Sequence, residues 1–136
     1  MDIAVSLDEA DLARAFKAAA GGDGPTVVID PLWGEPLVAA TEAAAPGARI
    51  VQIGQSAGPA ATLASGVVRG KQLEIYGYSN FVVPAEARRA AYLELVSQAA
   101  QGELVFPTET YPLARVSEAW ERQVNGPGAK LVVRLS

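Results

Sequence analysis

The sequence predicts an α/β fold, in which a mostly parallel sheet with flanking helices is followed by a C-terminal strand–helix–strand tail. Short apolar runs bounded by glycine and proline alternate with longer stretches whose apolar residues recur at helical spacing. The run Ile50–Ile53 is entered through Pro46-Gly47 and left through Gly54, which is typical of a buried parallel strand. Ligands bind at the carboxyl ends of such strands, so residues 54–58 are the first candidate site.

The composition narrows the classes of function. The chain has 136 residues, half of them hydrophobic, and a net charge of −4, which fits one domain with a real core and argues against a nucleic-acid partner. It contains neither cysteine nor histidine, which excludes disulfides and Cys- or His-based catalytic triads, and we expect no zinc site in this chain. No apolar run is long enough to span a membrane and the N-terminus has no basic segment, so we expect a cytoplasmic protein without a signal peptide.

The first elements lead to a cluster of glycines. Ile3–Leu7 is a short strand candidate, and a helix is predicted over residues 8–20, capped by Ser6 or Asp8. The glycines of residues 21–25 follow this helix rather than a strand. They are therefore predicted to end the helix and not to bind a nucleotide.

The centre of the sequence predicts a βαβ unit with short connections. Thr26–Asp30 is a strand, residues 35–45 form a helix, and the strand over 50–53 follows. A crossover of this kind is right-handed almost without exception. The elements predicted after it are, in order, a short helix over 59–65, a strand over 73–77, a long helix over 84–101, a strand over 104–109, a helix over 116–125 and a strand over 130–135.

The order of these motifs resembles that of a known enzyme family. Val27–Asp30, Gly34 and Gly47–Gly54 are similar to the second half of the coenzyme domain of medium-chain dehydrogenases/reductases. The match continues at Leu73–Tyr78, Tyr111-Pro112-Leu113, Glu118-Ala119-Trp120 and Gly128–Val133. The zinc-type alcohol dehydrogenases and the quinone oxidoreductase-like branch share these motifs, and the resemblance covers nearly the whole chain.

The resemblance implies a partial Rossmann-like sheet over residues 1–102 and a tail over residues 103–136 that, in the family, returns to a catalytic domain. The family's catalytic domain and its Gly-rich pyrophosphate loop have no counterpart in the sequence, and its zinc ligands, where present, lie in the missing part. We therefore expect a C-terminal fragment of an NAD(P)-dependent oxidoreductase, without catalytic residues of its own. NAD(P)H is the implied coenzyme, with weak or absent binding and little activity in this chain alone.

The resemblance also implies which residues face the coenzyme. They lie at the ends of three predicted strands: Asp30, Pro31, Leu32, Gly54, Gln55, Ser56, Gly77 and Tyr78. Asp30 is predicted to approach the coenzyme ribose, to act as an acid, or to cap the following turn, and the turn cap is favoured. The segments 54–56 and 77–78 either line the nicotinamide through backbone groups or are plain strand-end turns. Trp33 is predicted to be a packing residue.

The first two strands of the family's sheet have no counterpart in this sequence, and their absence affects the predicted sheet. Without them, Thr26–Asp30 has an open edge, which Ile3–Leu7 is predicted to fill. Helices 8–20 and 35–45 then share one face of the sheet, and helix 84–101 covers the other.

Open strand edges also predict partners. We expect a homodimer, formed through strand 73–78 or through the exposed edge of strand 26–30, and possible pairing with a separate N-terminal half. The alternative function is a non-catalytic association module that uses these sheet edges. Neither nucleic acid nor a membrane is expected as a partner.

Overall fold

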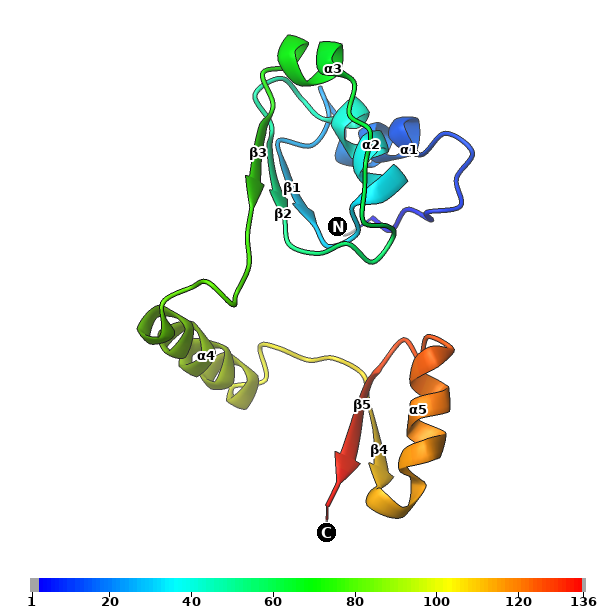
Figure 1. Cartoon of the computed structure of the whole chain (residues 1–136), viewed down its shortest axis with the longest axis vertical. Coiled ribbons are helices and arrows are strands. Elements are labelled where there is room, and N and C mark those ends of the chain that lie inside the picture. Colours follow the sequence, from blue (N-terminus) through cyan, green and yellow to red (C-terminus); the bar gives the residue numbers. More distant parts are fainter. Residues whose placement is uncertain (1–2, 136) are drawn as a thin grey trace. The chain divides into compact units, whose positions relative to one another are not determined.

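The computed structural model describes residues 3–135 and divides into two compact units (Figure 1). The first unit ends at Val82 and the second begins at Val83. The predicted boundary lies further along the chain, between residues 102 and 103. The difference concerns the long helix, which belongs to the second unit rather than to the unit that contains the sheet.

The first unit is built on a three-stranded parallel sheet. Its strands are β1 (Val27–Asp30), β2 (Arg49–Gln52) and β3 (Glu74–Gly77), in the order β1-β2-β3. The pairing aligns Asp30 with Gln52, and Gln52 with Gly77, so the three strands end in one row. The predicted α/β, partial Rossmann-like fold is confirmed.

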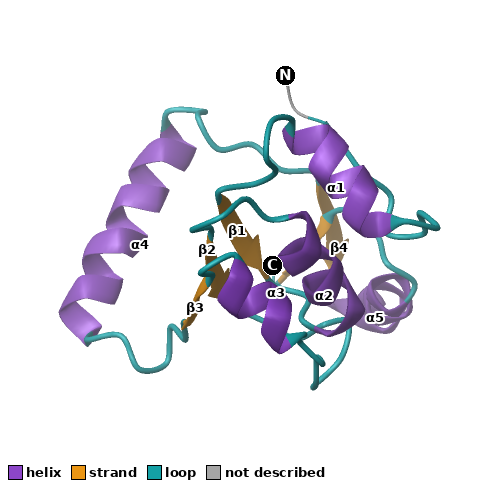
Figure 2. Ribbon diagram, turned by 90° about the horizontal axis from the view of Figure 1, so that it is seen from above, coloured by secondary structure: helices purple, strands orange, loops and turns teal. Residues whose placement is uncertain are grey.

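Helices α1 (Leu12–Ala20) and α2 (Gly34–Ala43) pack on each other on one side of this sheet, as predicted (Figure 2). α1 begins later than predicted because Asp11 is its N-cap, whose side chain accepts a hydrogen bond from the N–H of Arg14 at 3.0 Å. The helix predicted over 59–65 is displaced along the chain: α3 (Ser65–Gly70) begins only after Ala64, whose backbone is extended.

The core of the first unit lies between β2 and α2. Leu37, Thr41 and Ile50 are fully buried, and several alanines of α2 and of the segment between α2 and β2 are buried as well. The hydroxyl of Thr41 donates a hydrogen bond within the helix at 2.7 Å, so its polar atom is satisfied. Within the first unit, α1 and α2 leave the other face of the sheet uncovered, where Ile29 on β1 is 59% exposed and Tyr76 on β3 is 52% exposed.

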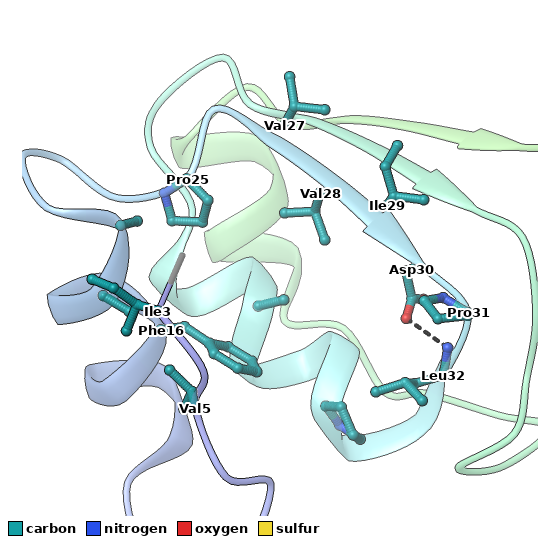
Figure 3. Close-up of a pocket in the computed structure, with 14 residues that line it drawn as sticks. Ile3, Val5, Phe16, Pro25, Val27, Val28, Ile29, Asp30, Pro31 and Leu32 are labelled. Carbon is teal, nitrogen blue, oxygen red and sulfur yellow. Dashed lines mark hydrogen bonds between the residues drawn. The ribbon is translucent and has the colours of Figure 1, made fainter. Parts of the chain in front are cut away.

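The N-terminal segment does not form the predicted strand. Residues 3–6 pair with no strand, so the prediction that Ile3–Leu7 fills the open edge of β1 is wrong. The side chains of Ile3 and Val5 instead line an apolar groove together with Phe16 of α1 (Figure 3). Apolar side-chain contact thus takes the place of backbone pairing. The outer edge of β1 has no partner strand within residues 3–135.

The second unit begins with α4 (Ala85–Ala100) and ends with the predicted strand–helix–strand tail. β4 (Thr108–Pro112) and β5 (Lys130–Arg134) pair in parallel and are connected through a 3-10 turn (Leu113–Arg115) and α5 (Val116–Val124). β4 begins later than predicted, because the pairing starts where the N–H of Lys130 donates to the C=O of Pro107 at 2.7 Å. In the described part of the chain, no helix has the length and apolar character that crossing a membrane requires.

Candidate functional site

The predicted site residues gather at one edge of the three-stranded sheet. Asp30, Gln52 and Gly77 occupy equivalent positions at the ends of β1, β2 and β3. The residues that follow them, 31–32, 54–56 and Tyr78, leave the sheet at the same edge. This is the carboxyl edge, where parallel sheets bind ligands.

Asp30 is buried, with 5% of its surface exposed. Its Oδ1 accepts a hydrogen bond from the N–H of Leu32 at 3.0 Å (Figure 3). The N–H of Trp33 donates to both carboxylate oxygens, at 3.0 Å to Oδ1 and 3.2 Å to Oδ2. These are the bonds of the turn cap that was favoured for Asp30. The carboxylate also lies at the N-terminal end of α2, where the helix dipole stabilises negative charge.

The loops after β1 and β2 are joined by backbone contacts. The C=O of Pro31 accepts hydrogen bonds from the backbone N–H of Ser56 at 3.3 Å and from the Ser56 hydroxyl at 3.2 Å. The C=O of Leu32 accepts one from the N–H of Ala57 at 2.8 Å. Gly54 approaches so closely that a Cβ at this position would lie 2.6 Å from the carbonyl oxygen of Pro31. Ser56 therefore ties the two loops together, and its N–H is not open to a ligand.

Two neighbouring backbone groups at this edge are open. The N–H of Ile53 donates to the C=O of Asp30 at 2.8 Å, and the N–H of Tyr78 donates to the C=O of Gln52 at 2.9 Å. The side-chain amide of Gln52 donates to the C=O of Gly54 at 2.6 Å. The C=O of Ile53 and the N–H of Gly54 have no hydrogen-bond partner among the residues that the structure describes. The two groups belong to one trans peptide unit and therefore point in opposite directions, so either can bind a polar ligand group, but a single carboxamide cannot bind both.

Gly77 and Tyr78 complete the edge on the β3 side. A Cβ at position 77 would meet no heavy atom within 4 Å, so the space beside Gly77 is open. Tyr78 is half exposed, and Gln55 on the neighbouring loop is exposed as well. This part of the edge therefore offers backbone groups and open space rather than carboxylates or amines.

One titratable group close to this edge is perturbed. Tyr76 of β3 donates a hydrogen bond from its hydroxyl to the carboxylate of Glu74 at 2.7 Å. This bond, together with the negative charge of Glu74, raises the pKa of the Tyr76 phenol. The phenol is thus a hydrogen-bond donor to a side chain of its own strand.

An apolar groove of about 570 Å³ lies beside β1 and reaches the same edge (Figure 3). β1, α1 and the N-terminal segment line it, and Asp30, Pro31 and Leu32 lie together at one end (Figure 3). Its walls are mostly aliphatic, which suits an apolar occupant. This groove was not predicted from the sequence, because the N-terminal run was expected to pair with β1. The available signal was the apolar face of α1 that carries Phe16.

The side chains of the chain do not fit a zinc site. Zinc in proteins is bound chiefly by Cys and His, with Asp and Glu as further ligands. The sequence has no Cys and no His, and no group of three potential metal ligands occurs within residues 3–135. We therefore assign no metal-dependent step to this chain.

Comparison with known proteins identifies the family. Residues 2–131 match the family model of zinc-binding dehydrogenases, so the chain belongs to this family. The resemblance to medium-chain dehydrogenases/reductases that the sequence motifs carry is thereby confirmed. No curated protein matches the chain.

Solved structures share the fold. A protein of Sinorhizobium meliloti 1021 assigned as an alcohol dehydrogenase has 28% identity and a TM-score of 0.74, over 93% of this chain and 34% of that one. AibC has 29% identity and a TM-score of 0.62, over 95% of this chain and 35% of its own length. CurA from Vibrio vulnificus, whose structure is a complex with NADPH, has 19% identity and a TM-score of 0.68, over 97% of this chain and 42% of its own length. The chain thus spans between 34% and 42% of these proteins.

Proposed function

We propose that this chain supplies the nicotinamide side of an NAD(P)-binding site in an oxidoreductase. The observation that carries the proposal is the single row formed by Asp30, Gln52 and Gly77, beside which the C=O of Ile53 and the N–H of Gly54 are open. Membership of a dehydrogenase family and the NADPH complex of a protein with the same fold support this choice of ligand.

The coenzyme, when bound, supplies the hydride chemistry, and the protein binds and orients it. In this proposal the N–H of Gly54 donates a hydrogen bond to the carboxamide oxygen. The C=O of Ile53 belongs to the same trans peptide and points the opposite way, so it does not bind the same carboxamide. Gly77 leaves room for the ring, while Pro31 and Leu32 form an apolar wall beside the ribose. No residue of this chain is assigned a catalytic role, and its contribution is to hold the ring in one orientation.

We further propose that this chain alone binds NAD(P)H weakly and has little or no reductase activity. A dinucleotide is held largely through its pyrophosphate, at a Gly-rich turn that follows a strand and opens a helix. The glycine cluster at residues 21–24 has the opposite order, since it follows α1 and precedes β1. A Gly-rich pyrophosphate-binding turn supplied from outside this sequence would complete the site.

Reduced nicotinamide mononucleotide tests the site, because it carries the nicotinamide and its ribose without the adenosine half of the coenzyme. In a titration followed by ¹⁵N NMR, we expect the amides of Gly54, Gln55 and Tyr78 to shift at ligand concentrations on the order of millimolar. Amides of β4 and β5 should not move, and AMP, the matched control ligand, should leave all of these amides unchanged. The proposal is refuted if the reduced mononucleotide shifts none of the three amides.

Calorimetry with NADPH tests the weakness of binding by this chain alone. A dissociation constant on the order of micromolar would contradict that part of the proposal. Mixing the chain with a separately expressed N-terminal half of the oxidoreductase, which contains the Gly-rich loop, should produce NAD(P)H oxidation that neither part shows alone. A mixture that stays inactive while each part is folded would count against pairing between the two halves.

The second candidate function is a non-catalytic association module. β1 and β3 are edge strands, and neither has a partner on its outer side within residues 3–135. The N–H groups of Glu74 and Tyr78 both donate to β2, so alternation along the strand turns the N–H of Ile75 outward. On β1 the C=O groups at positions 26 and 30 accept from β2, which turns the N–H of Ile29 outward. Open edges of this kind pair readily with another chain, which supports a homodimer through β3 or β1.

Sedimentation at micromolar concentration tests this association. We expect a dimer, which Ile75→Pro should dissociate if β3 forms the interface, and Ile29→Pro if β1 does. Each proline removes one outward N–H without removing a bond to β2, so the two variants are matched controls for each other. A parent chain that sediments as a clean monomer would contradict the homodimer.

A further inference from the structure

We infer that Asp30 is a positioning residue for the nicotinamide edge. Through the strained turn at Trp33, it holds in place the loop that carries the open N–H of Gly54. The inference rests on the proposed function, because it concerns the same site. Asp30 acts here through the backbone of two loops and does not itself contact the coenzyme.

Trp33 has a backbone conformation that residues with a side chain rarely adopt. Its φ is 58° and its ψ is −158°, at the border of a region occupied essentially by glycine. Residues held in such regions persist only where their surroundings fix them, and they are concentrated at ligand sites. Trp33 is also the N-cap residue of α2, so this conformation directly precedes the first turn of the helix.

The carboxylate of Asp30 fixes Trp33. Both carboxylate oxygens accept from the N–H of Trp33, at 3.0 Å and 3.2 Å, and Oδ1 also accepts from Leu32. Hydrogen bonds to an ionised acceptor are stronger than those between neutral groups. Because Asp30 is 5% exposed, water competes little for these bonds.

The turn at Trp33, fixed by Asp30, also holds the loop after β2. The C=O of Leu32 accepts from the N–H of Ala57 at 2.8 Å. Gly34, with a φ of 60°, passes so close to the same loop that a Cβ would lie 3.1 Å from the carbonyl oxygen of Ala57. Gly54 opens this loop, so any displacement of the turn at Trp33 is passed on to the segment with the open backbone groups.

The decisive residue is Ala57, which lies on the second loop and bonds to Leu32 rather than to Asp30. A carboxylate that served only as a cap of the turn after β1 would protect the amide of Trp33 and leave Ala57 unaffected. A positioning residue for the edge must protect both amides. Amide hydrogen exchange, measured residue by residue by NMR, separates these two roles and needs no coenzyme.

The test is a series of variants in the full chain: Asp30→Asn, Asp30→Ser and Asp30→Ala. Asparagine keeps one acceptor oxygen, and exchange at Trp33 and Ala57 should stay within about threefold of the parent. Alanine removes the acceptor and should accelerate exchange at both amides on the order of tenfold. The exchange rates of the serine variant should lie between those of the asparagine and alanine variants. If the alanine variant does not fold, the serine variant takes its place in the comparison. Glu35→Ala, which removes an exposed carboxylate from the first turn of α2, is the matched control and should leave Ala57 unchanged.

Titration with reduced nicotinamide mononucleotide then relates the loop to the site. Variants that accelerate exchange at Ala57 should show a smaller shift of the Gly54 amide at the same ligand concentration. Unchanged exchange at Ala57 in the serine and alanine variants overturns the inference, whether or not the nucleotide binds. Accelerated exchange with an unchanged Gly54 shift overturns it as well. A parent chain that does not respond to the nucleotide refutes the proposed function itself, a result distinct from either of these.

Discussion

A Cβ at Gly54 would lie 2.6 Å from the carbonyl oxygen of Pro31, so these two residues fit together only because position 54 is a glycine. The requirement is for space and not for an unusual backbone conformation. Gly54→Ala must therefore push the two loops apart, and we expect the free energy of unfolding to fall by about 1–3 kcal/mol. Urea unfolding followed by Trp33 fluorescence, in a Trp120→Phe background, measures this effect in the first unit.

Gly66 provides the matched control for this substitution. It lies in α3, where a Cβ would meet no heavy atom within 4 Å. Gly66→Ala should raise the stability by roughly 0.5–1 kcal/mol, because alanine is the better helix former. Equal effects of the two substitutions would contradict the close packing of the loops.

Lys71 joins the residues before β3 to the C-terminal end of α2. Its ammonium group donates hydrogen bonds to the C=O groups of Thr41 at 3.2 Å and Ala44 at 2.8 Å, and to that of Glu42. A helix leaves its last carbonyls unpaired, and positive charge is favourable there. Lys71→Met keeps the aliphatic stem but removes the donors, so we expect the free energy of unfolding to fall by about 1–3 kcal/mol.

The same urea unfolding assay checks this prediction. Lys17→Met is the matched control, because Lys17 is an exposed lysine near the end of α1. Its removal should change the free energy of unfolding by no more than about 0.5 kcal/mol. A Lys71→Met variant as stable as the parent would show that the bonds to α2 contribute nothing measurable.

The sheet could be predicted from the sequence because its strands are short apolar runs between glycine and proline. Ile50 lies in such a run and is fully buried. Ile3–Leu7 has a similar composition and was wrongly predicted to be a strand. Local composition indicates that a segment can form a strand. Whether it pairs with a neighbouring strand also depends on the other contacts that its side chains can make. Here the contact of Ile3 and Val5 with the groove beside α1 takes the place of pairing with β1.

The position of the candidate site could be predicted, but its internal bonding could not. Because parallel strands end at a common edge, Asp30 and Gly54 could be named from the sequence pattern, whereas Gly77 could be named only through the resemblance to the family. The bond between Ser56 and Pro31 joins residues 25 positions apart, and no local pattern encodes it. The strain at Trp33 was equally hidden, since a tryptophan in that position predicts packing and not a backbone conformation typical of glycine.

The Glu109–Arg122 pair predicts a pH dependence in the second unit. The guanidinium of Arg122 donates to the carboxylate of Glu109 at 3.0 Å, and this bond, aided by one from the Tyr111 hydroxyl, holds the pKa of Glu109 below its usual value of 4.5. A pKa that folding lowers adds stability above the unfolded value of 4.5, and this contribution is lost as the pH falls through the lowered pKa. Arg122→Met should raise the pKa of Glu109 towards 4.5. The free energy of unfolding should then fall less steeply as the pH is lowered.

NMR titration of the Glu109 carboxyl carbon measures this pKa directly. Arg115→Met is the matched control, because Arg115 pairs with Glu118 and lowers the pKa of that carboxyl by the same kind of bond. It should shift the titration of Glu118 and leave that of Glu109 unchanged. A pKa of Glu109 in the parent that is not below 4.5 would contradict the assigned bond.

Gly77 offers a test that separates stability from binding. A Cβ at this position meets no heavy atom within 4 Å, so Gly77→Ala should change the free energy of unfolding by no more than about 0.5 kcal/mol. The added methyl group narrows the open space that we propose for the nicotinamide ring. We therefore expect binding of reduced nicotinamide mononucleotide to weaken about tenfold, measured by the shift of the Tyr78 amide.

Gly66→Ala again serves as the control for Gly77→Ala, since it adds the same methyl group at an open position away from the carboxyl edge. It should leave the response of Tyr78 unchanged. A Gly77→Ala variant that is as stable as the parent and binds the nucleotide equally well would remove Gly77 from the proposed site. The proposed site would then consist only of the groups after β2, the C=O of Ile53 and the N–H of Gly54. Those groups are open regardless of the side chain at position 77.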